Sequence, residues 1–104
     1  MIPQKTVEEL IIKHSSLEKD LASGELDKKL FAEKSKEYSD LNEIIVNAKN
    51  YISFQREKEE LEKILNDSSG EEELKKMASL ELDELQNQYY LNEKKLKLFL
   101  LPKD

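Results

Sequence analysis

The sequence has few of the residues that interrupt helices and none that form covalent cross-links. Its 104 residues include two glycines, two prolines and no cysteine. The lack of cysteine excludes disulfides and thiolate metal sites, which fits a reducing compartment. Because glycine and proline break helices most reliably, their scarcity leaves three long stretches rich in Leu, Glu and Lys. We therefore expect an all-α protein without a loop that could carry a catalytic site.

Basic charge and long apolar runs are also scarce. There are 23 acidic against 17 basic residues, a net charge of −6, and Arg56 is the only arginine. Because nucleic-acid binding draws on a basic surface and on the arginine fork, we expect no direct DNA binding and no broad RNA binding. No apolar run approaches the roughly 20 residues needed to span a bilayer. These features predict a cytoplasmic protein with no membrane contact.

Turn-forming residues and apolar spacing predict a three-helix antiparallel bundle with a short first helix and two long helices. The predicted helices cover about 7–23, 28–66 and 70–100 of a single domain. Gly24 can adopt the left-handed conformation that ends a helix, and Asp27 is a suitable N-cap for the next one.

Two capping boxes are predicted at the other helix starts. Thr6 with Glu9, and Ser69 with Glu72, have the spacing at which a hydroxyl and a carboxylate satisfy the first amides of a helix.

The two long helices carry different apolar patterns. The apolar stripe of 28–66 lapses into charged residues between Gln55 and Glu60, where we expect the helix either to bend or to lose contact with its neighbours. The third helix has a heptad seam that predicts coiled-coil-like packing, with Asn92 as a polar residue that can fix its register. The seam consists of Leu82, Leu85, Tyr89, Asn92, Leu96 and Phe99.

The apolar run at the C-terminal end should be partly uncovered. Leu98, Phe99, Leu100 and Leu101 precede Pro102, and apolar residues in such a place are normally covered by more protein. We therefore expect a fragment of a larger protein, whose exposed end promotes association at high concentration.

No residue carries an evident catalytic, cofactor or metal role. His14 is the only histidine, and one carboxylate, Glu18, is its only potential partner at helical spacing, so we expect a structural role.

The acidic residues alternate with lysines at i,i+4 spacing and are interpreted as solvated helix faces. They are Glu57, Glu59, Glu60 and Glu62, and the run Glu71, Glu72 and Glu73. The predicted pairs are Glu59 with Lys63, Glu71 with Lys75 and Glu72 with Lys76.

The aromatic residues have a simple interpretation as well. Base stacking requires a basic groove around the rings, and the charge around these is mixed or acidic. Tyr38 and Tyr89 fall on apolar stripes and are expected in the core. The other aromatics considered are Tyr51, Phe54 and Tyr90.

Two sequence elements carry a family resemblance. Ser-Lys-Glu-Tyr-Ser-Asp-Leu at 35–41 and Leu-Lys-Leu-Phe-Leu-Leu-Pro-Lys-Asp at 96–104 are similar to elements of the bacterial peptide chain release factor 1 family, in its N-terminal domain. The order of predicted elements also resembles that domain: a short helix, a long helix, an Asp-Ser-rich turn and another long helix.

The resemblance implies a function in translation termination at the stop codons UAA and UAG. In that family the stop-codon-reading tripeptide and the Gly-Gly-Gln motif for peptidyl-tRNA hydrolysis belong to other domains, so this chain would not be an enzyme. The implied partners are the remaining domains of the same chain and the ribosome, at its stalk-base protein and ribosomal RNA. No residue can be assigned to that contact. Starting at Met1 without an Arg-rich transit peptide, the chain is expected to be bacterial.

Two other functions remain open from the residues alone. The heptad seam of the third helix also suits a helical coiled-coil adaptor or dimerisation module. An enzyme would require an unrecognised carboxylate site, for which Glu57, Glu59 and Glu60 are the candidates.

Overall fold

Residues 1–102 form four helices arranged as two hairpins. The computed structural model describes residues 1–102, and this part contains no strand. The helices are α1 (Gln4–Ala22), α2 (Lys28–Asn42), α3 (Ile45–Asn66) and α4 (Glu72–Leu100). The all-α class is confirmed, whereas the predicted three-helix bundle is wrong because the second predicted helix is divided in two.

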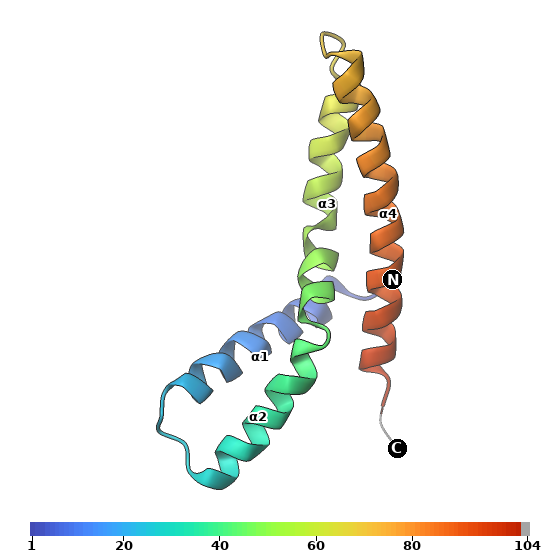
Figure 1. Cartoon of the computed structure of the whole chain (residues 1–104). Coiled ribbons are helices and arrows are strands. Elements are labelled where there is room, and N and C mark those ends of the chain that lie inside the picture. Colours follow the sequence, from blue (N-terminus) through green and yellow to red (C-terminus); the bar gives the residue numbers. More distant parts are fainter. Residues whose placement is uncertain (103–104) are drawn as a thin grey trace.

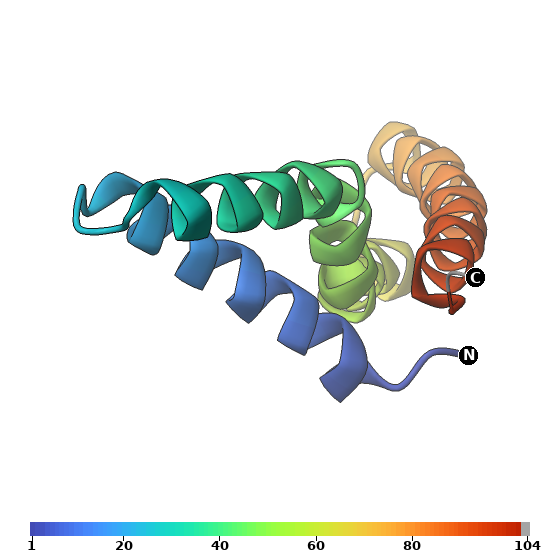
Figure 2. The same ribbon diagram turned by 90° about the horizontal axis from the view of Figure 1, so that it is seen from below.

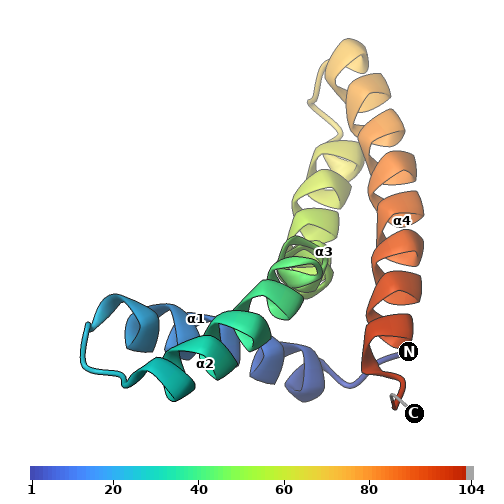
Figure 3. The same ribbon diagram turned by 60° about the horizontal axis from the view of Figure 1, so that its bottom comes forward.

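The two hairpins point in different directions. In Figure 1, α3 and α4 run side by side along the long axis, and α1 and α2 form a second hairpin that leans away from the lower end of α3. Figures 2 and 3 show this second hairpin projecting to one side of the α3–α4 pair. The molecule measures 61 × 32 × 19 Å, and α3 packs against each of the other helices, most extensively against α4. Coiled-coil-like pairing is therefore confined to one helix pair.

The break between α2 and α3 lies at Glu43 and Ile44 rather than at residues 55–60. Ile44 leaves the helical conformation with φ −120° and ψ −9°. The amides of Glu43 and Ile44 donate to the carbonyls three residues earlier, at 3.3 and 3.0 Å, which tightens the last turn of α2. Both Ile44 and Ile45 are buried at this corner. The sequence contains no glycine or proline here, and the run of β-branched residues at 44–46 is the only local signal for the break.

Residues 55–60 are continuously helical, so the bend, one of the two predicted alternatives, is wrong. The side chain of Gln55 donates to Glu59 at 3.3 Å along the helix surface. The helix continues without interruption to Asn66.

The start of α2 agrees with the sequence prediction. The Asp27 carboxylate accepts a hydrogen bond from the amide of Leu30 at 2.8 Å. Gly24 has φ +72°, a conformation that residues with a side chain rarely adopt. Together these two residues end α1 and begin α2, which confirms both assignments.

Neither predicted capping box is formed. The first helix begins at Gln4, and the Pro3 carbonyl accepts from the amides of Thr6 and Val7, so Thr6 lies inside the first turn where it cannot cap. At the other site the Ser69 hydroxyl donates to the Asp67 carboxylate at 2.7 Å. Both predictions were wrong. Thr6 lies inside its helix, and the hydroxyl of Ser69 is already bonded to Asp67.

The core surrounds the lower half of α3, where all four helices and the N-terminal segment contribute residues. Val7, Ala48 and Leu96 are fully buried. Ile2 is also buried, and its amide donates to the hydroxyl of Tyr51 at 3.2 Å. The residues before α1 therefore help to hold the two hairpins together.

The seam of α4 is used within the chain. Asn92 is buried and its side-chain carbonyl accepts a hydrogen bond from Asn47 on α3 at 3.0 Å. This satisfies the polar interruption and links the register of α4 to that of α3.

The apolar end of α4 is at least partly exposed, as predicted. Leu98, Leu100 and Leu101 are 67%, 38% and 59% exposed, whereas Phe99 packs against the core. Lys103 and Asp104, the last residues of the family-like element at 96–104, lie outside the described residues. Among residues 1–102, no helix has the length and apolar character needed to cross a bilayer.

The buried and exposed leucines of α4 allow a matched test of the core. Leu96→Ala should lower the free energy of unfolding by about 2–5 kcal/mol, because it leaves a cavity where all elements meet. Leu98→Ala, two residues away on the exposed side, should change it by less than about 0.5 kcal/mol. Urea unfolding followed by circular dichroism measures both. Equal losses in the two variants would show that this core is misplaced.

Candidate functional site

A tyrosine pair joins the N-terminal segment, α3 and α4. The rings of Tyr51 and Tyr89 stack at 4.8 Å between centroids, and Phe54 lies 4.1 Å from Tyr89. The Tyr89 hydroxyl donates to that of Tyr51 at 3.1 Å, and the Tyr51 hydroxyl in turn lies 3.3 Å from Glu93 and 3.4 Å from the carbonyl of Ile2. The cluster is a structural junction whose polar atoms are satisfied internally.

The electrostatics of this junction favour a neutral tyrosine and a charged glutamate. Burial, followed by the hydrogen bond to Tyr51 and the nearby negative charge of Glu93, raises the pKa of Tyr89 to about 12. The hydrogen bond from Lys97, at 3.1 Å, lowers the pKa of Glu93, and the N-terminal amine lies 4.0 Å away. Near neutral pH the Tyr89 hydroxyl is therefore a hydrogen-bond donor and no general base.

His14 connects α1 to α2. It is buried, its Nε2 donates to the side-chain carbonyl of Asn42 at 2.6 Å, and its ring stacks on Tyr38 at 4.7 Å. The Tyr38 hydroxyl donates to Glu18 at 3.1 Å, and partial burial, followed by this bond, raises the pKa of Tyr38. Within residues 1–102 no three His, Asp or Glu side chains are grouped so that they could hold a metal ion.

The element at 35–41 belongs to this α1–α2 contact. It lies on α2, where Tyr38 stacks on His14 and Leu41 is buried at the corner with α3. Its tyrosine and leucine thus hold the first hairpin together and attach it to α3.

The predicted i,i+4 ion pairs of the acidic runs are not formed. In the described part of the chain the ion pairs within 4.0 Å are elsewhere, and most of them join different elements. An exposed lysine and glutamate gain little by holding one geometry, because water screens the attraction and side-chain entropy opposes it. The three predicted pairs were Glu59 with Lys63, Glu71 with Lys75 and Glu72 with Lys76.

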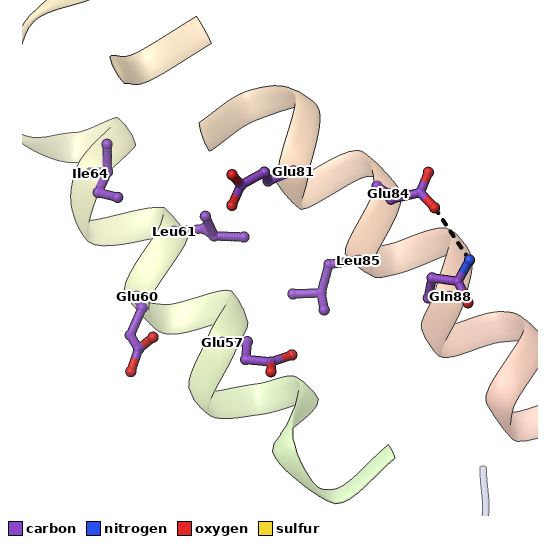
Figure 4. Close-up of a pocket in the computed structure, with 8 residues that line it drawn as sticks. All are labelled: Glu57, Glu60, Leu61, Ile64, Glu81, Glu84, Leu85 and Gln88. Carbon is purple, nitrogen blue, oxygen red and sulfur yellow. Dashed lines mark hydrogen bonds between the residues drawn. The ribbon is translucent and has the colours of Figure 1, made fainter. Parts of the chain in front are cut away.

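The acidic residues instead contribute to a groove between the upper halves of α3 and α4. The groove has a volume of about 560 Å³ and is lined by eight residues. They are Glu57, Glu60, Leu61, Ile64, Glu81, Glu84, Leu85 and Gln88. In Figure 4, Leu61 and Leu85 extend into the space between the helices, while Glu60 and Glu84 lie at its edges. The groove thus has an apolar floor and acidic rims.

A second hollow continues the groove toward the middle of the molecule. It has a volume of about 200 Å³ and shares Glu57, Leu85 and Gln88 with the first. Asn50 and Asn92 lie at its far end. The two hollows therefore follow a single face of the α3–α4 hairpin.

Sequence reasoning missed this groove but the sequence contains its signal. Glu57, Leu61 and Ile64 follow i,i+4,i+7 spacing on α3, and Glu81, Leu85 and Gln88 have the same spacing on α4. Glu59, the third residue of the proposed carboxylate site, is not in the lining and contacts Gln55. The structure therefore does not bring the three suggested glutamates together.

Comparison with known proteins identifies relatives of the whole chain. Residues 10–104 match the PCRF domain family. The chain is 64% identical over 104 residues to peptide chain release factor 1 of Pelagibacter ubique, covering 100% of this chain and 29% of that protein. The resemblance carried by 35–41 and 96–104 is thereby confirmed.

More distant relatives match a similar share of their length. Peptide chain release factor 1 of Magnetococcus marinus is 31% identical over 106 residues, covering 100% of this chain and 29% of the relative. That of Orientia tsutsugamushi is 36% identical over 95 residues, covering 91% and 26%. The chain thus spans less than a third of the length of these curated relatives. No solved structure gives a significant match.

The raised pKa of Tyr89 predicts a loss of stability in alkali. Its ordinary value is 10.0 and its folded value about 12, so the unfolded chain releases this proton first. The stabilisation is complete below pH 10 and declines as the pH rises toward 12. Measured by urea unfolding, Tyr89→Phe should show a shallower decline than the unsubstituted chain, and Tyr90→Phe on the exposed side should not. Identical pH profiles for all three proteins would contradict the assignment.

Proposed function

The chain belongs to the PCRF domain family, and from this premise we propose that it is the N-terminal domain of a release factor that directs translation termination at UAA and UAG. The observation that carries the proposal is the 64% identity to a peptide chain release factor 1 over the full 104 residues. Since the chain spans 29% of that relative, the activity of the whole factor would depend on further domains.

We propose that residues 1–104 act as one helical domain of that larger factor. The support is the shared core, in which residues of all four helices and the N-terminal segment surround the lower half of α3. A domain that has its own core can keep its shape while the parts attached to it move.

In this proposal the domain contributes position, and the chemistry of peptide release takes place elsewhere in the factor. The two glycines, Gly24 and Gly70, are isolated, so the sequence contains no Gly-Gly-Gln. Tyr89 and Glu93, whose pKa values depart from the ordinary ones, both hydrogen-bond with Tyr51 at the structural junction. Their satisfied hydrogen bonds favour a scaffold over a catalytic centre.

The proposed partner is the ribosome, met in the cytoplasm at the stalk-base protein and ribosomal RNA. The support is the family relationship together with an extended shape, 61 Å in its longest dimension. Such a shape lets a small domain reach from the body of a factor to a separate contact. In this proposal the contact with the ribosome positions the factor, and this domain holds no cofactor.

The dimerising adaptor is the weaker candidate. Its seam on α4 would have to face a second copy, yet Leu96 is fully buried and Asn92 bonds to Asn47 on α3. A dimer through this seam would first have to remove α3 from α4 and break the core.

Peptide release from programmed ribosomes tests the proposal. The full-length protein encoded by this gene should release peptide at UAA and UAG but not at UGA. Deleting residues 1–104 should lower kcat/KM by about tenfold or more and affect kcat at saturation much less, because the lost contribution is binding and positioning. Chain 1–104 alone should release nothing.

Two outcomes would contradict the proposal. Peptide release by chain 1–104 alone would place chemistry in this domain. An unchanged kcat/KM after the deletion would show that the domain does not position the factor on the ribosome.

A further inference from the structure

The groove on the α3–α4 hairpin is an unfilled apolar surface with a charge of one sign around it. We propose that it is a docking site for a basic amphipathic helix of a protein partner. Its floor is formed by Leu61, Ile64 and Leu85, and its lining includes four glutamates and no basic residue. Apolar side chains on one face of a helix would fill the floor, and lysine or arginine on its flanks would meet the rims.

The charge around the groove is uncompensated. The ion pairs within 4.0 Å in residues 1–102 do not include Glu57, Glu60, Glu81 or Glu84. Glu84 accepts a hydrogen bond from Gln88 at 3.2 Å, which leaves its charge unneutralised. Acidic rims beside an apolar floor complement a basic amphipathic segment and repel anionic ligands.

The dimensions of the groove suit a helix of a few turns. Along α3 the lining extends from Asn50 to Ile64, about 21 Å at 1.5 Å per residue. A partner helix of about 15 residues has this length. The volume of about 560 Å³ at the upper end could take the largest apolar side chains of such a helix.

The same observations disfavour two other occupants. RNA phosphates would face four carboxylates, and a second copy of this chain would bring another acidic groove on a molecule of net charge −6. A later segment of the same polypeptide is a third occupant, which peptide binding to the full-length protein tests. A separate basic protein therefore fits best, and this inference does not depend on the proposed function.

A designed peptide tests the groove directly. The probe is a fluorescently labelled helix of about 15 residues, with leucines at i, i+4 and i+7 and lysines on both flanks. We expect it to bind chain 1–104 saturably, and more weakly as ionic strength rises. The double variant E57K/E81K should weaken binding by about tenfold or more. The matched control E59K/D83K has the same charge on the same two helices outside the groove, and should bind like the unsubstituted chain.

Fluorescence anisotropy gives the affinities, and circular dichroism checks that both variants keep their helices. Equal weakening in E57K/E81K and E59K/D83K would mean general charge attraction and overturn the proposal, as would no binding of the basic peptide. Tighter binding of a single-stranded RNA oligonucleotide, or of a peptide with glutamates in place of the lysines, would also overturn it.

Two further measurements test whether the groove is filled by a second copy or by later residues of the same protein. Sedimentation should find a monomer at the peptide-binding concentration, whereas a homodimer dissociated by E57K/E81K would assign the groove to a second copy. The full-length protein should bind the peptide as tightly as chain 1–104 does. Loss of binding in the full-length protein would mean that its own later residues cover the groove.

Discussion

The packing of α3 against all three other helices is the constraint on which the structure depends. Its lower half is enclosed by the N-terminal segment, α1 and α4, and its upper half contacts α4 alone. The break at Glu43 and Ile44 lets the chain change direction while Leu41, Ile44, Ile45 and Ala48 all stay buried. Because the corner is tightly packed, the two hairpins form one body, although no covalent cross-link joins them.

Some features that depend only on neighbouring residues were predicted correctly from the sequence. The helical class followed from the scarcity of breakers, and Asp27 and Gly24 marked a helix boundary because a cap and a left-handed turn need only neighbouring atoms. The α2–α3 break could not be found in this way, since the buried residues on both sides keep helical spacing. Tertiary packing requires the chain to turn there, and the β-branched run at 44–46 is not enough to indicate it. The first helix begins at Gln4, before Thr6, because the Pro3 carbonyl accepts from the amides of Thr6 and Val7.

The groove illustrates a similar limit for function. On each helix taken alone, its acidic residues were interpreted as a solvated face. That interpretation is correct in that the glutamates face water. What the sequence could not provide was the pairing of α3 with α4, which puts Leu61 opposite Leu85 and gathers carboxylates from two helices around them. The family relationship, in contrast, was visible in two short elements, one of which closes the α1–α2 contact through Tyr38.

Because the two hairpins share one core, we expect them to be held at a fixed angle. Electron–electron distance measurement between spin labels tests it most directly, because the chain has no cysteine and labels attach only at E25C and S68C, in the loops at the ends of the two hairpins. We expect a single narrow distance distribution. A broad or two-peaked distribution would contradict it.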